Sequence, residues 1–330
     1  MISMDKKILV FFCFIVVGFR LGLMAQDQKT NQNQKGQIIT LDPAKLDSAN
    51  RNHGTKPVPK NPAGATMKNS KVDQKELTPQ EKQAQTFTQD GVKKAKEQNY
   101  DGAIQDFTKS IKAYENAIAY MNRGYCYMIK ARYDLAIEDE NKAINLSKSY
   151  GKAYFVRGAC KFHLNDFDGS EKDLTDALKF DHKNPAAFNY MAAINLMKKD
   201  YQGALENYNV VIRLDSSYPD VFTNRAMVRH NLQDYNGAIL DCNTALKRNP
   251  NNVSAYNNRG ATKILLKDYQ GALLDLNKAI ELSPSDADAF NNRGKVKQFL
   301  GDTEGACKDW NKAFDLGITE SKDLIIKYCK

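Results

Sequence analysis

Apolar residues recur between residues 84 and 320 with the spacing of amphipathic helices, in pairs of segments that return every 34 residues. The stretch 253–286 shows the pattern most clearly, with one apolar-striped segment at 253–266, a second at 269–282 and polar residues between them. Apolar positions three or four residues apart are typical of a helix with one buried face. The pattern therefore predicts a pair of packed helices.

The same pair returns along the chain at positions marked by small and aromatic residues. A small residue recurs every 34 residues, or 33 at the first step, at Gly91, Gly124, Gly158, Ala192, Ala226, Gly260 and Gly294. An aromatic residue lies four positions before each, at Phe87, Tyr120, Tyr154, Phe188, Phe222, Tyr256 and Phe290. Alanine lies twelve positions after six of the seven, and Ser170 takes that place in the third unit. This period predicts stacked units that share one elongated core.

Helix boundaries can be placed from the capping residues. Asp268 lies where the second helix of its unit needs an N-cap acceptor, and Asp166, Asp200, Asp234 and Asp302 repeat that position. Pro185 and Pro219 are expected at the first helical position, and Pro250 and Pro284 after the end of a second helix.

These motifs resemble the signature of the tetratricopeptide repeat family, in which aromatic, Gly, Ala and Pro residues lie at set offsets. The resemblance implies an all-α fold, a right-handed α-solenoid of about seven helix-turn-helix units within 81–320, closed by a capping helix at 321–330. Glu140 and Cys242 depart from the family pattern, because they replace its bulky residue in the second helix. The seven units are expected at 84–116, 117–150, 151–184, 185–218, 219–252, 253–286 and 287–320.

The first 80 residues have a different composition. Lys6 and Lys7 precede a short apolar run, and the small residue Ala25 follows it, which is the pattern of a secretory signal peptide at 1–25. An uncleaved inner-membrane anchor is the alternative. Residues 26–80 are rich in Asn, Gln, Lys and Pro and predict a disordered linker. We therefore expect an exported protein, periplasmic or secreted, with no membrane span after cleavage.

The net charge of +9 says little about partners, because the first 80 residues supply six of the nine charges. A nucleic-acid-binding solenoid needs a concentrated basic face, so nucleic acid is not an expected partner. Five cysteines follow the signal segment, and an odd number cannot form a closed set of disulfides. Cys126 and Cys160 lie one repeat apart, too far for a disulfide. We expect buried free thiols.

An arginine ladder precedes the small residue in five units, and an Asp lies sixteen positions after each Arg. Met191 and Asn207 replace both charges in the fourth unit, which is expected if the two residues pair, because a lone buried charge is costly. The first unit keeps Asp106 opposite Asp90, which pairing does not explain. The predicted structural ion pairs are Arg123–Asp139, Arg157–Asp173, Arg225–Asp241, Arg259–Asp275 and Arg293–Asp309.

In the family, the first helices of the units line a groove that binds extended peptides or partner helices. On that face, the second and third units present Met121, Tyr125, Met128, Phe155 and Phe162, which suggests an apolar anchor pocket. The later units present Asn224, Asn257, Asn258, Asn291 and Asn292, and Asn122 fits the same series. An amide both donates and accepts hydrogen bonds, so such a series is suited to hold a peptide backbone. It resembles the asparagine ladder of O-GlcNAc transferase. The alternatives are that the amides are tolerated polar residues and that the apolar set is core.

Catalytic motifs are absent from the sequence: it has no P-loop, no dinucleotide fingerprint, no G-x-S-x-G and no histidines at metal-ligand spacing. We expect no enzyme activity, no cofactor and no metal. The predicted function is a protein-protein interaction scaffold that binds a peptide or helix in the cell envelope. A structural or self-associating repeat protein, in which homo-oligomers form through exposed repeat surfaces, is the alternative.

Overall fold

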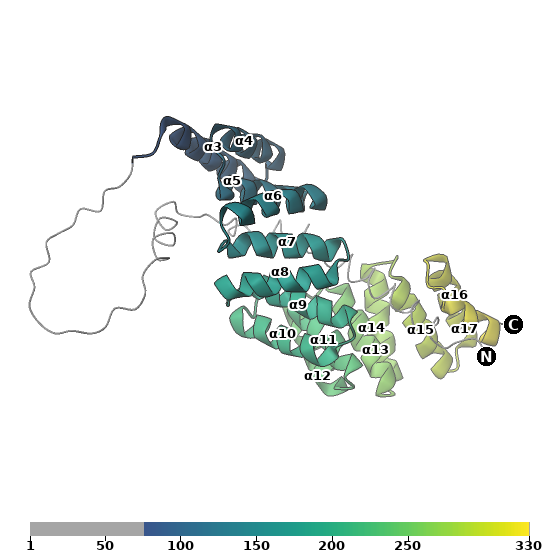
Figure 1. Cartoon of the computed structure of the whole chain (residues 1–330). Coiled ribbons are helices and arrows are strands. Elements are labelled where there is room, and N and C mark those ends of the chain that lie inside the picture. The colour runs from purple at the N-terminus through teal and green to yellow at the C-terminus, as the bar shows by residue number, and fades with distance from the viewer. Residues whose placement is uncertain (1–75, 330) are drawn as a thin grey trace, which may run out of the picture. The chain divides into compact units, whose positions relative to one another are not determined.

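The computed structural model of the chain describes residues 76–329 (Figure 1). These residues form fifteen helices and no strand. The first described helix begins at Pro79, two residues before residue 81, where the solenoid was expected to begin. The predicted signal peptide and most of the predicted linker lie outside the described residues.

The described chain divides into two compact units at residue 166. The helices of the first unit are α3 (Pro79–Lys96), α4 (Tyr100–Ala113), α5 (Ala117–Ile129), α6 (Tyr133–Leu146) and α7 (Gly151–His163). Those of the second unit are α8 (Phe167–Phe180), α9 (Pro185–Met197), α10 (Tyr201–Leu214), α11 (Val221–Asn231), α12 (Tyr235–Arg248), α13 (Val253–Leu265), α14 (Tyr269–Leu282), α15 (Ala287–Phe299), α16 (Thr303–Asp315) and α17 (Ser321–Tyr328).

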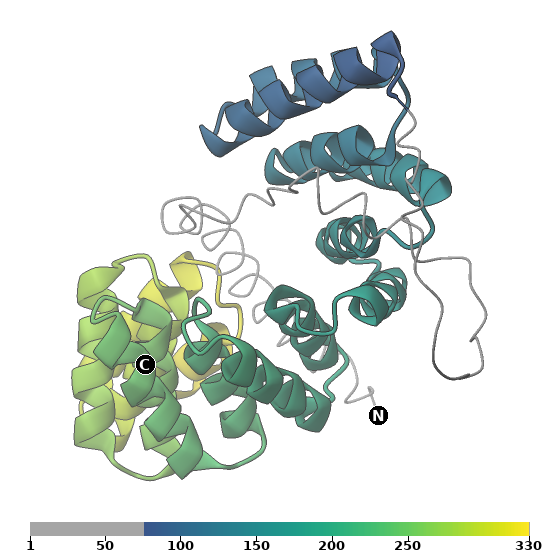
Figure 2. The same cartoon turned by 90° about the vertical axis from the view of Figure 1, so that its left-hand side faces the viewer.

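Within each unit, every helix packs against the next one along the chain (Figure 2). In the second unit the first helices of neighbouring repeats, α11, α13 and α15, also contact one another. Within each unit, the helices of a repeat therefore form a pair that packs on the neighbouring helices of the same unit. This arrangement confirms the predicted all-α solenoid.

The recurring small residues let the two helices of a repeat approach closely. A Cβ atom added at Gly260 on α13 would lie 2.8 Å from Cγ of Leu276 on α14, and one at Gly91 would lie 2.7 Å from Cε1 of Phe107. The alanines twelve positions later are fully buried at Ala103, Ala136, Ala204, Ala238, Ala272 and Ala306. Small and bulky side chains thus interlock between the helices of each pair.

The turn inside each repeat ends one helix and caps the next. Asp200, Asp234, Asp268 and Asp302 accept a hydrogen bond from the backbone N–H three residues later, at 2.8–3.0 Å, which confirms four predicted N-caps. The residue before each Asp adopts a left-handed conformation, for example Lys267 with φ 61°. Only the seventh repeat places a glycine there, Gly301 with φ 86°, where a glycine is least strained.

The proline predictions gave mixed results. Helix α9 begins at Pro185, as expected. The prediction for Pro219 is wrong, because α11 begins at Val221. Asp220 intervenes with φ 50° and therefore cannot continue a right-handed helix from Pro219.

The cysteine prediction is corrected at the C-terminal end. Cys307 on α16 and Cys329, directly after α17, form a disulfide with their Cα atoms 5.7 Å apart. Spacing in the sequence did not reveal this pair, because α17 folds back onto α16 and brings residues 22 positions apart together. Cys126, Cys160 and Cys242 are buried free thiols, as expected. Among the described residues, no helix is both long enough and apolar enough to cross a membrane.

Candidate functional site

The arginine ladder forms a repeated set of buried ion pairs. Arg123, Arg225, Arg259 and Arg293 each donate from Nε and Nη2 to both carboxylate oxygens of the Asp sixteen positions later, at 2.5–2.9 Å. The four aspartates are at most 5% exposed. The Asp139 carboxylate raises the pKa of Arg123 above its ordinary value by hydrogen bonding. The predicted Arg157–Asp173 pair joins residues of the two different units and stays a prediction.

Each ladder arginine also reaches the preceding repeat. The Nη1 atoms of Arg157, Arg225, Arg259 and Arg293 donate to asparagine side chains sixteen positions earlier, at 2.6–2.9 Å. These acceptors, which the sequence analysis missed, are Asn141, Asn209, Asn243 and Asn277. Their regular recurrence along the sequence is the signal that could have identified them. For Arg225, Arg259 and Arg293, the guanidinium thus connects the two helices of its own repeat and the second helix of the previous one.

In the first repeat, two lysines take the place of the arginine as partners of the buried aspartate. Asp106 is 3% exposed, and Lys94 and Lys109 lie 2.5 Å and 3.2 Å from its carboxylate oxygens. These two amino groups explain why Asp106 is retained although Asp90 takes the position of the arginine. Burial raises the pKa of Asp106, but the hydrogen bonds and positive charges of Lys94 and Lys109 together outweigh it, so the pKa is lowered.

The predicted apolar anchor residues lie in or against the core of the first unit. Met121 is 1% exposed and Phe162 is 7% exposed, so neither side chain is available to a ligand. Tyr125, Met128 and Phe155 are partly buried and pack against a cluster that contains Val156 and Cys160. Met121 and Phe162 therefore belong to the core, and the other three side chains pack against it.

The predicted amide residues divide between the two units. Asn122, in the first unit, is 9% exposed and donates to the Ile118 carbonyl of its own helix at 2.9 Å. In the second unit, the remaining five lie partly buried on three neighbouring first helices, α11, α13 and α15. We name this set the asparagine row: Asn224, Asn257, Asn258, Asn291 and Asn292.

Hydrogen bonds tie the asparagine row from repeat to repeat. Asn292 Nδ2 donates to Asn257 Oδ1 at 3.0 Å, and Asn258 Nδ2 donates to the Thr223 carbonyl at 3.4 Å. At the end of the row, Asn291 Oδ1 accepts from Ser321 Oγ at 3.1 Å. Each amide group has more hydrogen-bonding capacity than these contacts use. The row therefore has both internal contacts and unused donors and acceptors.

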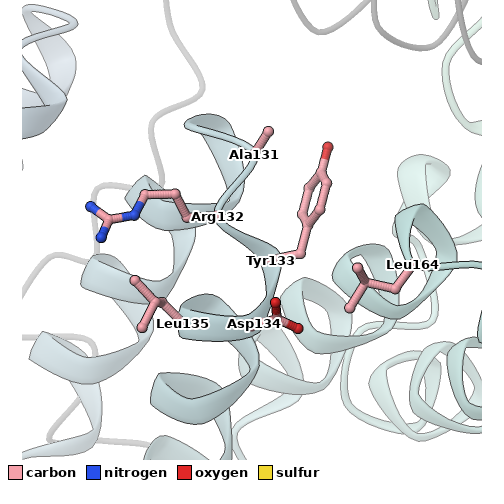
Figure 3. Close-up of a pocket in the computed structure, with 6 residues that line it drawn as sticks. All are labelled: Ala131, Arg132, Tyr133, Asp134, Leu135 and Leu164. Atoms are coloured by element: carbon pink, nitrogen blue, oxygen red, sulfur yellow. The ribbon is translucent and has the colours of Figure 1, made fainter.

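A small pocket lies at the turn between α5 and α6 (Figure 3). Its volume is about 320 Å³, and Ala131, Arg132, Tyr133, Asp134, Leu135 and Leu164 line it. The Tyr133 ring stacks on His163 with the ring centroids 4.8 Å apart. The Arg132 side chain points away from Tyr133 and Leu164 in Figure 3, and its guanidinium lies over the Tyr127 ring.

His230 packs against a neighbouring helix. His230 Nδ1 lies 3.0 Å from Thr262 Oγ1 on the next first helix, and burial lowers the pKa of His230. Residues 76–329 contain no group of three or more His, Cys, Asp or Glu side chains placed to hold a metal ion.

Four models of tetratricopeptide repeats match the chain, at residues 94–153, 219–252, 242–273 and 264–298. No curated protein matches its sequence. A tetratricopeptide repeat protein from Parabacteroides merdae is 14% identical, with a TM-score of 0.56 over 76% of this chain and 100% of that one. The Pseudomonas aeruginosa pilF structure is 15% identical, with a TM-score of 0.57 over 68% of this chain and 99% of that one.

A chain of the APC/C Cut9–Hcn1 hetero-tetramer is 18% identical, with a TM-score of 0.57 over 65% of this chain. The match covers 42% of that longer chain. The solved structures share the stacked helix pairs described above, and the repeat models match both units. The chain belongs to the tetratricopeptide repeat family.

Proposed function

We propose that the chain is a non-catalytic protein-interaction scaffold that binds an extended peptide segment of a protein partner along the asparagine row. The single observation behind this proposal is that five partly buried amides lie on three adjacent helices. Amides spaced one repeat apart suit a peptide backbone, whose N–H and C=O groups recur whatever its side chains. The likeness to a chain solved in a hetero-tetramer supports a scaffold role.

We also propose that the protein is exported. The charged start and short apolar run of the sequence favour a signal peptide. The Cys307–Cys329 disulfide supports the same compartment, because disulfides persist in oxidising environments outside the cytosol.

The test compares two triple variants after a partner has been identified by cross-linking in cell envelopes. Asn224, Asn258 and Asn292 are changed to Ala in one variant, and the exposed residues Asn236, Asn251 and Asn311 in the control. Three hydrogen bonds of about 1 kcal/mol each predict an approximately 100-fold weaker Kd for the partner peptide. Because Asn258 and Asn292 also have internal contacts, circular dichroism must show that the first variant remains folded.

A second test asks whether the asparagine row recognises the backbone of the peptide rather than its side chains. N-methylation of peptide amides should abolish binding, whereas alanine substitution of most peptide side chains should have little effect. Unchanged affinity in the Asn224, Asn258 and Asn292 variant would exclude the row as the binding face.

One observation favours self-association as a second candidate. Leu240 on α12 and Leu274 on α14 occupy the same position in adjacent repeats and are 63% and 72% exposed. Exposed apolar side chains at a repeated position suit contact with another copy. Sedimentation equilibrium separates the candidates: a monomer at all concentrations supports the scaffold, and a dimer that is lost in L240E/L274E supports self-association.

A further inference from the structure

A disulfide attaches the last helix to the end of the second unit. Cys307 lies on α16, and Cys329 follows the last residue of α17. The bond therefore closes a loop that contains the end of α16, the following turn and all of α17. The two ends of this short segment are both fixed to α16.

Apart from the disulfide, α17 is held by its packing on α16 and by the hydrogen bond from Ser321 to Asn291. It has eight residues, its N-cap residue Glu320 makes no capping hydrogen bond, and only Ser321 is fully buried. Ile326 is 67% exposed. A helix of this length is marginal on its own in water. The position of α17 therefore depends strongly on the covalent bond.

Helix α17 contacts residues of both α16 and α15. Trp310 on α16 is 1% exposed, and its ring lies 5.6 Å from that of Tyr328 on α17. Ser321, at the start of α17, donates to Asn291 Oδ1 at 3.1 Å. The helix thus contacts the only tryptophan of the chain, whose Nε1 also donates to the Asn291 carbonyl on α15 at 3.3 Å, and it occupies an acceptor at the end of the asparagine row.

We propose that the Cys307–Cys329 disulfide is a redox-controlled lock, whose reduction releases α17 and uncovers Trp310. The reductant is a dithiol, such as that of a thiol–disulfide exchange protein. One of its thiolates attacks a sulfur of the pair and displaces the other cysteine as a thiolate. Its second thiol then resolves the mixed disulfide. Overall, two electrons and two protons pass to Cys307 and Cys329, and the dithiol becomes a disulfide.

The release has a consequence for binding that rests on the proposed function. Once α17 leaves, Asn291 loses its hydrogen bond from Ser321 and its amide oxygen becomes available to a peptide. Reduction would thus extend the binding face at its C-terminal end. The lock itself involves only α16, α17 and α15 and is tested independently of any ligand.

The experiment measures tryptophan fluorescence of the full chain before and after reduction with dithiothreitol. Because Trp310 is the only tryptophan, its emission reports directly on the covering helix. We expect the emission maximum to shift to longer wavelength and acrylamide quenching to increase on reduction. The C307S/C329S variant should show the reduced spectrum without reductant and should not respond to it.

Thiol alkylation followed by mass spectrometry distinguishes local release from unfolding. In the reduced native protein, iodoacetamide should label Cys307 and Cys329 and leave the buried Cys126, Cys160 and Cys242 unmodified. An unchanged Trp310 spectrum after both cysteines have been shown to be reduced would overturn the proposal, as would labelling of all five. If Trp310 is uncovered but peptide affinity does not change, the lock stands and its link to the asparagine row is refuted.

Discussion

At the scale of single residues, Glu140 is the clearest exception to the repeat pattern. It occupies the position that Phe107, Leu276 and Trp310 fill in other repeats, and it is 0% exposed. Within the described chain, neither of its carboxyl oxygens has a hydrogen-bond partner. Burial raises the pKa of Glu140 well above its ordinary value of 4.5; the neighbouring Asp139 adds to the increase, and Arg157 opposes it. The carboxyl group is therefore a source of instability.

Stability should consequently depend on pH through Glu140. The folded state holds the proton more tightly than the unfolded state, so the stability that Glu140 contributes is greatest below pH 4.5 and is lost as pH rises through the raised pKa. Replacement by Leu should raise the free energy of unfolding at pH 8 by roughly 1–3 kcal/mol, because it removes an unsatisfied buried group. Replacement by Gln should flatten the pH dependence. Urea unfolding of the first unit, monitored from pH 4 to pH 9, measures both effects.

The control for Glu140 is the exposed Glu138 on the same helix. Its change to Gln should leave the pH dependence of unfolding as in the wild type. If Glu140→Gln and the wild type show the same decrease in stability with pH, another group is responsible.

The ladder arginines show which side-chain contacts a residue pattern in the sequence can predict and which it cannot. Their pairing with aspartates sixteen positions away was predictable, because both charges disappear together in the fourth repeat. Their bonds to Asn209, Asn243 and Asn277 were not predicted. A polar residue on a helix surface has many possible hydrogen-bond partners, and only the packing of one repeat on the next selects among them.

At the scale of helices, the repeated turn determines where each second helix begins. Asp268 accepts from the Gly271 N–H at 2.9 Å, and the same bond recurs in neighbouring repeats. In the second repeat, Arg132 takes this position and forms no capping bond at the start of α6. The second repeat is thus a natural comparison for the effect of the cap.

Removing the cap at α14 should therefore be more costly than the same change at α6. Asp268→Ala leaves a backbone N–H without its acceptor and should lower the free energy of unfolding by about 1 kcal/mol. Arg132→Ala should change it by less than about 0.5 kcal/mol, the usual range for a surface substitution. Chemical denaturation of both variants measures the difference, and equal effects would show that the aspartate cap adds nothing to stability.

At the scale of the whole molecule, stability should spread only between neighbouring repeats, because within a unit each helix pair contacts the pairs next to it in the chain. Leu276 is 0% exposed beneath Gly260, whereas Leu274 on the same helix is 72% exposed. Changing each of these leucines to alanine tests whether a loss of stability stays within neighbouring repeats.

Leu276→Ala should cost about 2–5 kcal/mol, because it leaves a cavity in the core. Leu274→Ala should cost less than about 0.5 kcal/mol. Hydrogen exchange should show lost protection in α13, α14 and the adjacent repeats for Leu276→Ala, with little change in residues 76–166. Uniform loss of protection over both units would contradict the nearest-neighbour description.

The sequence by itself determined the repeat period, the helix pairs, four of the N-caps and the charge pairing within repeats. Each of these depends on residues no more than one repeat apart, where chain geometry leaves few arrangements. Tertiary structure decided the properties that depend on contacts across repeats or at a chain end. It buried Met121 and Phe162 in the core and bonded the Asn122 side chain to the Ile118 carbonyl of its own helix. It also joined Cys307 to Cys329, because folding of α17 onto α16 brought together two cysteines that the sequence did not mark as a pair.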